Sequence, residues 1–318
     1  MIALGIESSN VRGMGHLFHA LLYAEYLRTR RIPFLLLLNQ DAASEQILAQ
    51  RGIGYTLVDY TDTCSNWEKE LIDAHHIDVW FNDKFETSSE LGRHVKEAGA
   101  RFCVIDDVGP GEAFADLAIC GMLLPTKTEF LCDNVCAGIE YIILNPEVAR
   151  FRRLREKVNQ ILVTLGGSDT YGVTLEVVEA LNERGMTADV LVGPDFAFRA
   201  DLDRINVGCF RILQNLPSLI ASFYDYDFAI TGGGVTCCEA MASGLPCMVI
   251  ANEPQEVNTG RFFADKGACL YAGFRGKEWD RSALDRIAGL PLADMSGRGM
   301  RTFALDAVER VMEAVRDK

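Results

Sequence analysis

The sequence predicts an α/β protein with two domains, each built around a parallel sheet. Short apolar runs of strand length alternate with amphipathic stretches of helical length along the chain, and this pattern is typical of strands joined by crossover helices. The chain has 318 residues, about twice the usual size of one domain. A charged, helix-rich stretch, EVARFRRLREKVN at 147–159, interrupts the alternation. We therefore expect residues 1–148 to form the first domain and residues 149–318 the second.

The first domain is expected to begin with a strand, because its first residues form an apolar run. The strand candidates, in order, are Ile2–Ile6, Phe34–Asn39, Tyr55–Val58, Val79–Phe81, Phe102–Ile105, Leu117–Cys120 and Tyr141–Leu144. Amphipathic stretches between them predict helices at Leu17–Arg28, Ala42–Arg51 and Ser88–Ala98. The stretch 147–159 is predicted to be helical as well.

The second domain repeats the alternation. Its strand candidates are Gln160–Leu165, Asp189–Val192, Phe210–Leu213, Phe228–Thr231, Cys247–Ile250 and Cys269–Tyr271, with helices expected at Thr174–Arg184 and Pro217–Ser222. Between Met300 and Val315, apolar residues recur at helical spacing. This spacing predicts a C-terminal amphipathic helix that packs on the surface of a domain.

Composition excludes several classes of protein. Apolar residues make up 49% of the chain and charged residues 24%, which excludes disordered and fibrous proteins. The formal net charge of −14 argues against a nucleic-acid or anionic-membrane partner. No apolar run is long enough to span a bilayer, and the first residues carry no cleavage signal. The ten cysteines form no repeated CxxC pairs, so we expect a protein of the reducing cytoplasm.

A glycine-rich turn, RGMGH at Arg12–His16, precedes the first predicted helix. Gly13 and Gly15 would let the backbone approach a ligand closely, at a helix start that favours anions. The turn is not the dinucleotide fingerprint, because Phe18 stands where that motif has its third glycine. A Rossmann dehydrogenase is therefore disfavoured.

His16 has two interpretations. It is either a general base facing a ligand, since imidazole titrates near neutral pH, or a residue that caps or packs the helix. We expect the positive end of the helix to lower its pKa. His19 lies three positions further on the same side, but no acidic third ligand stands at a matching spacing, so no metal site is predicted.

Two further glycine-rich turns follow strands of the second domain. In LGGSDT at 165–170, Gly167, Ser168 and Asp169 suit either a phosphate contact or an ordinary tight connection. In TGGGVTCCE at 231–239, three glycines are expected to leave bare amides at a helix start. The candidate ligand-binding residues of this turn and helix start are Gly232, Gly233, Gly234, Thr236 and Glu239. Glu239 would either accept hydrogen bonds from ribose hydroxyls or stabilise the helix start.

Taken together, RGMGH, LGGSD and TGGGVTCCEAMASGLP, the last followed by Gln255, resemble the GT-B nucleotide-sugar proteins around the pseudaminic-acid-pathway UDP-sugar hydrolase. The resemblance implies two Rossmann-like domains facing across a cleft. It also implies that His16 is catalytic, that the TGGG turn with Thr236 and Glu239 binds UDP, and that Gly167, Ser168 and Asp169 line the cleft. Gly13, Gly15 and Gln255 complete the expected binding residues.

The chain departs from that family at two places. The hydrolases typically carry an arginine soon after the GxGH histidine, where this chain has Leu17-Phe18-His19. They also have an Asp-His-Tyr-like segment at the end of a middle strand, where this chain has Phe81-Asn82-Asp83-Lys84-Phe85-Glu86-Thr87-Ser88. We expect this segment to face the sugar, with Asp83 as the second candidate base. Lys84 either contacts a sugar or phosphate oxygen or is an exposed loop lysine.

The expected function is hydrolysis of a UDP-sugar to UDP and a free amino-deoxy sugar, in nonulosonic acid or surface polysaccharide biosynthesis. Water activated by His16 would attack C1, and no metal or other cofactor is expected. One alternative is an inverting GT-B glycosyltransferase that uses a UDP- or CMP-sugar. Another is a non-catalytic module that binds a nucleotide sugar. The sequence leaves the oligomeric state open.

Overall fold

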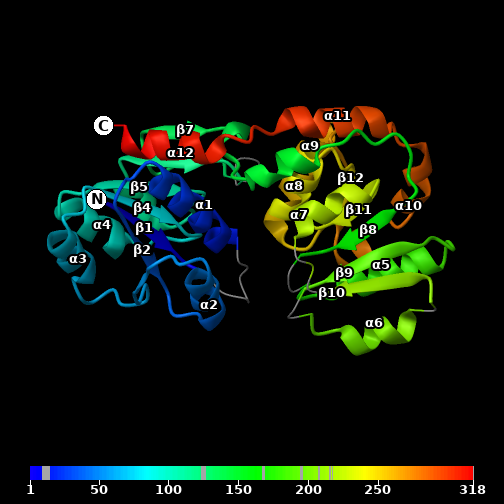
Figure 1. Ribbon diagram of the computed structural model, residues 1–318, viewed down its shortest axis with the longest axis horizontal. Helices are drawn as coiled ribbons and strands as arrows, with labels where there is room; N and C mark the ends of the chain where they lie inside the picture. The colour runs from blue at the N-terminus through cyan, green and yellow to red at the C-terminus, as the bar shows by residue number, and fades with distance from the viewer. Residues whose placement is uncertain are drawn as a thin grey trace. The chain divides into compact units, whose positions relative to one another are not determined.

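The computed structural model describes residues 1–8, 15–122, 127–166, 169–193, 196–206, 208–214, 216 and 218–317 (Figure 1). Its contacts divide the chain into two compact units, Leu144–Ala304 and a unit that combines Met1–Ile143 with Leu305–Lys318. The last helix, which we expected in the second domain, thus belongs to the first unit. Among the described residues, no helix combines the length and apolar character needed to cross a bilayer.

The first unit is built on a seven-stranded sheet with the order β3-β2-β1-β4-β5-β6-β7, in which all neighbouring strands are parallel. Its strands are β1 (Ile2–Ile6), β2 (Phe34–Leu38), β3 (Thr56–Leu57), β4 (Val79–Asp83), β5 (Arg101–Ile105), β6 (Leu117–Cys120) and β7 (Val135–Ala137). Its helices are α1 (Gly15–Thr29), α2 (Ala42–Gln50), α3 (Trp67–His75), α4 (Ser89–Glu97) and α12 (Ala307–Arg316), with 3₁₀ turns η1 (Pro110–Phe114) and η2 (Ile139–Tyr141).

Both faces of this sheet are buried, as the apolar strand sequences require. On one face, side chains of β1 such as Leu4 pack with α1, α2 and α12. On the other, Trp80 and Phe102 pack with α3 and α4. Helix α12 joins the first core through Ala307, Val311, Met312 and Val315. Its apolar stripe therefore explains why the end of the chain belongs to the first unit.

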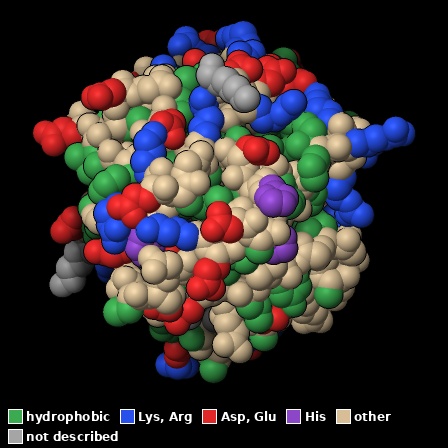
Figure 2. Space-filling view, turned by 90° about the vertical axis from the view of Figure 1, so that its left-hand side faces the viewer, with side chains coloured by type: hydrophobic (Ala, Val, Ile, Leu, Met, Phe, Trp, Pro, Cys, Tyr) green, Lys and Arg blue, Asp and Glu red, His purple; other side chains and the backbone are tan. Residues whose placement is uncertain are grey.

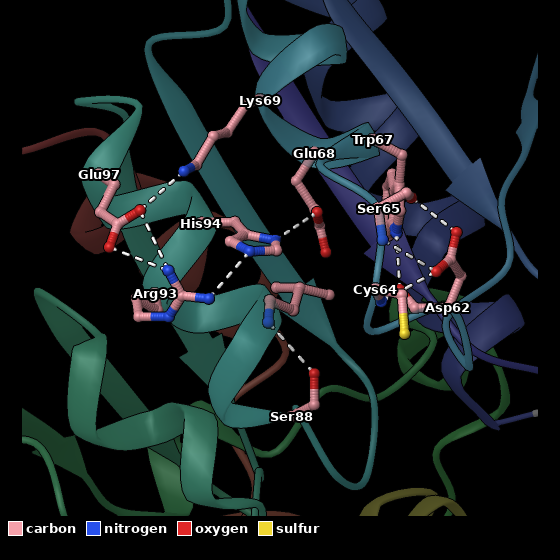
Figure 3. A network of polar contacts seen from close by, with 11 residues as sticks. Asp62, Cys64, Ser65, Trp67, Glu68, Lys69, Ser88, Arg93, His94 and Glu97 are labelled. Carbon is pink, nitrogen blue, oxygen red and sulfur yellow. Dashed lines mark hydrogen bonds and ion pairs between the residues drawn. The ribbon is translucent and has the colours of Figure 1, made fainter.

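A network of polar contacts links α3 to α4 (Figure 3). Nδ1 of His94 lies 2.9 Å from a carboxylate oxygen of Glu68, and both side chains are buried. On the solvent side, Lys69 of α3 and Arg93 of α4 both bind Glu97. The buried contact between His94 and Glu68 therefore joins the two helices.

The second unit is built on a six-stranded sheet, again entirely parallel, with the order β10-β9-β8-β11-β12-β13. Its strands are β8 (Ile161–Thr164), β9 (Ala188–Val192), β10 (Phe210–Gln214), β11 (Phe228–Thr231), β12 (Cys247–Ala251) and β13 (Cys269–Phe274). Its helices are α5 (Val173–Asn182), α6 (Arg199–Ile205), α7 (Leu219–Ser222), α8 (Val235–Ala242), α9 (Pro254–Asp265), α10 (Ala283–Arg286) and α11 (Leu292–Thr302). The 3₁₀ turns are η3 (Pro146–Phe151), η4 (Phe223–Asp225), η5 (Gly276–Glu278) and η6 (Ile287–Gly289).

Three expected elements differ from the structure. The last strand of the first sheet is β7, not Tyr141–Leu144, whose apolar side chains are largely buried without joining the sheet. The expected helix between 300 and 315 is two helices, because the backbone is extended at Phe303. Within 147–159, only η3 is helical.

Arginine side chains explain why 152–159 is not a helix. Arg152 donates to the carbonyls of Ala242 and Met300 at 2.9 and 3.2 Å. Arg155 is fully buried, and its guanidinium donates to four backbone carbonyls, those of Arg153, Phe223, Tyr226 and Ser243. These bonds hold the segment extended against the second unit, so tertiary contacts override its helix propensity.

Figure 2 shows one face of the molecule, on which acidic and basic side chains are interspersed among apolar and neutral ones.

All ten cysteines are free thiols. Cys103 and Cys247 are buried as their apolar surroundings predict, whereas Cys209 is exposed. No disulfide therefore contributes to the stability of either unit.

Candidate functional site

In each sheet, the strand order reverses between two strands whose carboxyl ends precede the predicted site residues. In the first sheet the reversal lies between β1 and β4, where Ile6 pairs with Asp83. In the second it lies between β8 and β11, where Thr164 pairs with Thr231. Open α/β sheets bind ligands at the carboxyl ends of the strands at such a switch point. The topology thus marks two candidate places, one in each unit.

At the first switch point, three side chains of α1 converge on the carboxylate of Asp83. Nδ1 of His16 lies 2.5 Å from Oδ1, and Nδ1 of His19 lies 3.0 Å from Oδ2. The hydroxyl of Tyr23 donates to Oδ2 at 2.8 Å. Asp83 itself is only 1% exposed, whereas 26% of the His16 side chain is exposed. His16 is therefore the member of this cluster that solvent reaches most easily.

The Asp83 carboxylate raises the pKa of His16. Burial on its own would lower the pKa of His16, but the charge and hydrogen bond of Asp83 outweigh it and raise this pKa. This is opposite to the lowering that we expected from the helix start, because a buried carboxylate at hydrogen-bond distance acts more strongly than the helix dipole. Burial would also raise the pKa of Asp83, but His19 and His16 hold it well below its usual range.

Asp83 is therefore an ionised positioning group and not a free base. Both of its oxygens are engaged by neighbouring side chains. Nδ1 of His16 is held by this carboxylate, which leaves Nε2 as the ring atom that can accept a proton. A buried acid that orients an imidazole in this way is the arrangement found in many hydrolytic sites. We expected Asp83 as a second candidate base, but a buried carboxylate with both oxygens engaged is not positioned to take a proton from water.

Asn82 and Lys84, the residues on either side of Asp83, are also withdrawn from solvent. The Oδ1 atom of Asn82 accepts a bond from Nε1 of Trp80 at 2.8 Å, and its Nδ2 donates to Thr87 at 3.0 Å. A Cβ on Gly5 would lie 2.2 Å from that Oδ1, so a glycine is needed on β1 beside it. Asn82 therefore belongs to the core and is not available to a sugar.

Lys84 is not an exposed loop lysine, because it is only 3% exposed. Its Nζ lies 3.2 Å from a carboxylate oxygen of Glu7 and 4.0 Å from the centre of the Tyr60 ring. Its charge is thus satisfied inside the first unit by an acid and an aromatic face. The contact with a sugar or phosphate oxygen stays a prediction.

In the second unit, Asp169 holds the start of α5. Its two oxygens accept bonds from the backbone N–H groups of Val173 and Thr174 at 2.9 and 2.8 Å. The side chain is therefore committed to the helix, in the ordinary role of an acid at an N-terminus. Its carboxylate is the cap of α5, and the expectation that Asp169 lines a ligand site stays a prediction.

The TGGG turn at the second switch point is occupied in part by an acid of α9. The carboxylate of Glu256 accepts bonds from the backbone N–H groups of Asn252, at 2.7 Å, and of Gly233. Burial raises the pKa of Glu256. A Cβ on Gly233 would lie 2.7 Å from Cβ of Glu256, so this glycine is required for packing. The turn is therefore not the row of bare amides that we expected.

The space around the other sequence-predicted residues differs from position to position. In the second unit, a Cβ on Gly234 would make only ordinary contact. In the first unit, no described atom lies within 4 Å of a Cβ built on Gly15. Thr236 and Gln255 are half-buried near the starts of α8 and α9. Glu239 is half-buried in the second turn of α8, and its Oε1 accepts from the backbone N–H of Asn145 at 3.4 Å.

Two buried polar atoms at the same strand ends lack partners among the described residues. They are Oγ1 of Thr231, the last residue of β11, and Oδ1 of Asn252, directly after β12. Leaving such an atom unpaired costs about 1–3 kcal/mol. Polar atoms without protein partners at this edge are what a bound polar ligand would satisfy. Gly13, Gly167 and Ser168, which the sequence also indicated, lie outside the described residues.

No protein-family model matches the chain. It is 24% identical over 272 residues to an uncharacterized protein of Methanocaldococcus jannaschii, covering 78% of this chain and 55% of that protein. It is also 24% identical over 278 residues to the spore coat polysaccharide biosynthesis protein SpsG of Bacillus subtilis, covering 82% and 80%. The chain thus spans about half the length of the first of these relatives.

Solved structures identify the fold. MurG of Acinetobacter baumannii superimposes with a TM-score of 0.74 and 12% identity over 99% of both chains. The chain has the GT-B fold. The spinosyn rhamnosyltransferase SpnG complexed with thymidine diphosphate gives a TM-score of 0.64 and 13% identity over the full length of both chains. A putative UDP-N-acetylglucosamine 2-epimerase of Listeria monocytogenes gives 0.59 and 12% over 99% of this chain and 95% of that one.

Two residues of the two candidate places, Tyr23 and Glu256, are not indicated by the sequence. Tyr23 lies seven positions after His16 on the same helix face, a spacing that points to a shared neighbour. His19 was noticed, but its acid comes from a strand 64 positions away. Glu256 follows Gln255 directly, and nothing in its neighbourhood in sequence indicates that it bonds to the TGGG turn.

Proposed function

We propose that this protein hydrolyses a nucleoside-diphosphate sugar, and that His16 takes the proton of the attacking water. The observation that carries the proposal is the short contact between His16 and the buried Asp83 at a switch point of the sheet. This contact provides an imidazole with a defined orientation and a free second nitrogen. A group positioned in this way is what general-base catalysis requires.

In the proposed reaction, water attacks C1 of the sugar while its proton passes to Nε2 of His16. The bond between C1 and the phosphate oxygen breaks, and the nucleoside diphosphate leaves with the electron pair. The imidazolium that forms is stabilised by the negative charge of Asp83. Tyr23 and His19 keep this carboxylate in place. The free sugar and the nucleotide are the products.

We place the nucleotide at the second switch point. Helix α8 begins there directly after the glycine turn, and the positive end of a helix favours a diphosphate. Because Glu256 binds the N–H of Gly233, the diphosphate would use N–H groups of the first turn of α8. The unpartnered oxygens of Thr231 and Asn252 lie at the same strand ends. Glu239 would accept hydrogen bonds from the ribose hydroxyls. Support for a nucleotide also comes from the similar GT-B structure that was solved with thymidine diphosphate.

The alternative function is transfer of the sugar to an acceptor hydroxyl. The proton chemistry of His16 would be the same, and one similar structure is a rhamnosyltransferase. The likeness to SpsG supports a role in making a surface polysaccharide, in which either reaction has a place. We favour a nucleotide-linked amino-deoxy sugar of nonulosonic acid synthesis as the substrate, because the glycine-rich turns resemble those of the pseudaminic-acid-pathway UDP-sugar hydrolases.

Product analysis distinguishes the two reactions. The full chain is incubated with a panel of UDP- and CMP-sugars in water enriched in heavy oxygen, with and without an acceptor. Hydrolysis by attack at C1 releases a free sugar that carries the label and an unlabelled nucleotide. Release only in the presence of an acceptor, with no label in the sugar, would show a transferase. Intact donors under all conditions would contradict both.

Glu239→Ala is expected to weaken UDP binding by about 1–3 kcal/mol, because hydrogen bonds to a charged group contribute that much. Titration calorimetry with a chelator present measures the effect. Glu179→Ala, which removes an exposed acid of α5 in the same unit, is the control and should bind like the wild type. Equal affinity in both variants would remove Glu239 from the nucleotide site.

A further inference from the structure

The geometry points to a metal site at the first switch point. His16, His19 and Asp83 would bind a divalent transition-metal ion of the zinc class. These residues each offer one ligand atom, and the three atoms lie within 4.8 Å of one another. Two imidazole nitrogens and one carboxylate oxygen are a donor set that zinc and similar ions prefer. The sequence did not predict this site, because its acid comes from β4 and not from the helix that carries the histidines.

The arrangement needs little movement to accept an ion. Nδ1 of each histidine already points at the same carboxylate, at 2.5 and 3.0 Å. Ligand atoms around a tetrahedral zinc stand at about 2.0–2.2 Å from the metal, so the three groups would have to separate only slightly. His16 and His19 project from one face of α1, three positions apart. Two rigid elements thus supply all three ligands.

The surroundings also favour a cation. The negative charges of Asp106 and Glu7 act on His16 in addition to that of Asp83. Lys84, the cation beside Glu7, is bound to that acid and to Tyr60. The hydroxyl of Tyr23 donates to the ligating carboxylate at 2.8 Å, the kind of outer contact that orients metal ligands. Partial exposure of His16 leaves a path for the ion from solvent.

Metal and proton compete for the same imidazole. An ion on Nδ1 of His16 uses that lone pair and leaves the proton on Nε2, which can then no longer accept one from water. The ion would therefore inhibit the hydrolysis described above, and this consequence rests on the proposed function. The binding itself does not, because it is measured without substrate.

Cobalt(II) is the probe, since its visible absorption reports coordination by nitrogen and oxygen ligands. The full chain is first treated with a chelator, dialysed and titrated with Co²⁺, and Zn²⁺ is then added in competition. One equivalent of Co²⁺ should bind with the absorption of a four- or five-coordinate ion, and Zn²⁺ should displace it. His19→Gln should weaken binding at least ~10–100-fold, the loss typical even for outer contacts of a metal site. His75→Gln removes an exposed imidazole and should change nothing.

His19→Gln is the decisive variant, because Asp83 is buried and its replacement can prevent folding. Binding of Co²⁺ with equal affinity by wild type and His19→Gln, or no absorption band in the wild type, would overturn the site. Zn²⁺ should also abolish sugar release, and a chelator should restore it. Full activity of the metal-loaded protein would show that the ion does not prevent His16 from accepting the proton, and would overturn the predicted inhibition. A chain that binds Co²⁺ as described but releases no sugar would contradict the proposed function alone.

Discussion

Replacing His16 by alanine is expected to lower the turnover of the UDP-sugar by roughly 10²–10⁴-fold, because a positioned general base contributes that much. This loss corresponds to about 3–5 kcal/mol of activation free energy. His16→Asn should do little better, because an amide cannot take up the proton. UDP affinity should stay unchanged, since we place the nucleotide in the second unit. Steady-state kinetics and calorimetric titration, both with a chelator present, measure the two quantities.

The control for this variant is His75→Ala, which removes an exposed histidine of α3 and should leave turnover unchanged. A turnover within about threefold of the wild type in His16→Ala would remove the residue from the mechanism, since loss of a general base costs far more. Asp83 would not be the replacement base, because its carboxylate is buried and engaged by three side chains.

Arg155→Met is expected to destabilise the second unit by about 2–4 kcal/mol, the range for breaking a buried network of hydrogen bonds. The guanidinium is fully buried and donates to four carbonyls, and burial lowers its pKa to about 10. Methionine fills part of the space but donates nothing. The unfolding temperature of the second unit should fall by roughly 5–15 °C. Calorimetry of the full chain measures this change.

Arg150→Met is the matched control, because Arg150 lies in the same stretch and its side chain is 78% exposed. It should unfold like the wild type. If Arg155→Met also unfolds like the wild type, water replaces the guanidinium at these carbonyls, and the arginine does not hold the segment in place.

The local pattern of the chain was sufficient for most of the fold. Alternation of apolar runs and helical stretches predicted β1, β6, β8 and β11 close to their observed limits, because strand and helix periodicity is a local property of sequence. Glycine-rich turns after strands indicated the candidate places, since backbone turns depend on a few adjacent residues. The prediction of two parallel α/β units followed, and the GT-B likeness confirms it.

Side-chain partners were decided only by the tertiary structure. His16 and Asp83 are 67 positions apart. No sequence spacing predicts that the start of α1 lies beside the end of β4. The sequence also left open whether Lys84 is exposed, and only the structure shows that Glu7 and Tyr60 contact it inside the first unit.

The stretch 147–159 shows the same division between local and long-range effects. Its composition favours a helix, yet Arg152 and Arg155 donate to carbonyls of residues far away in sequence. Helix propensity contributes at most about 1 kcal/mol for each ordinary residue, whereas a buried guanidinium without partners would cost several times more. The sequence by itself therefore determined where strands, helices and glycine turns begin, because these depend on neighbours along the chain. The tertiary structure determined which charged groups meet, because their burial is stable only where distant partners satisfy them.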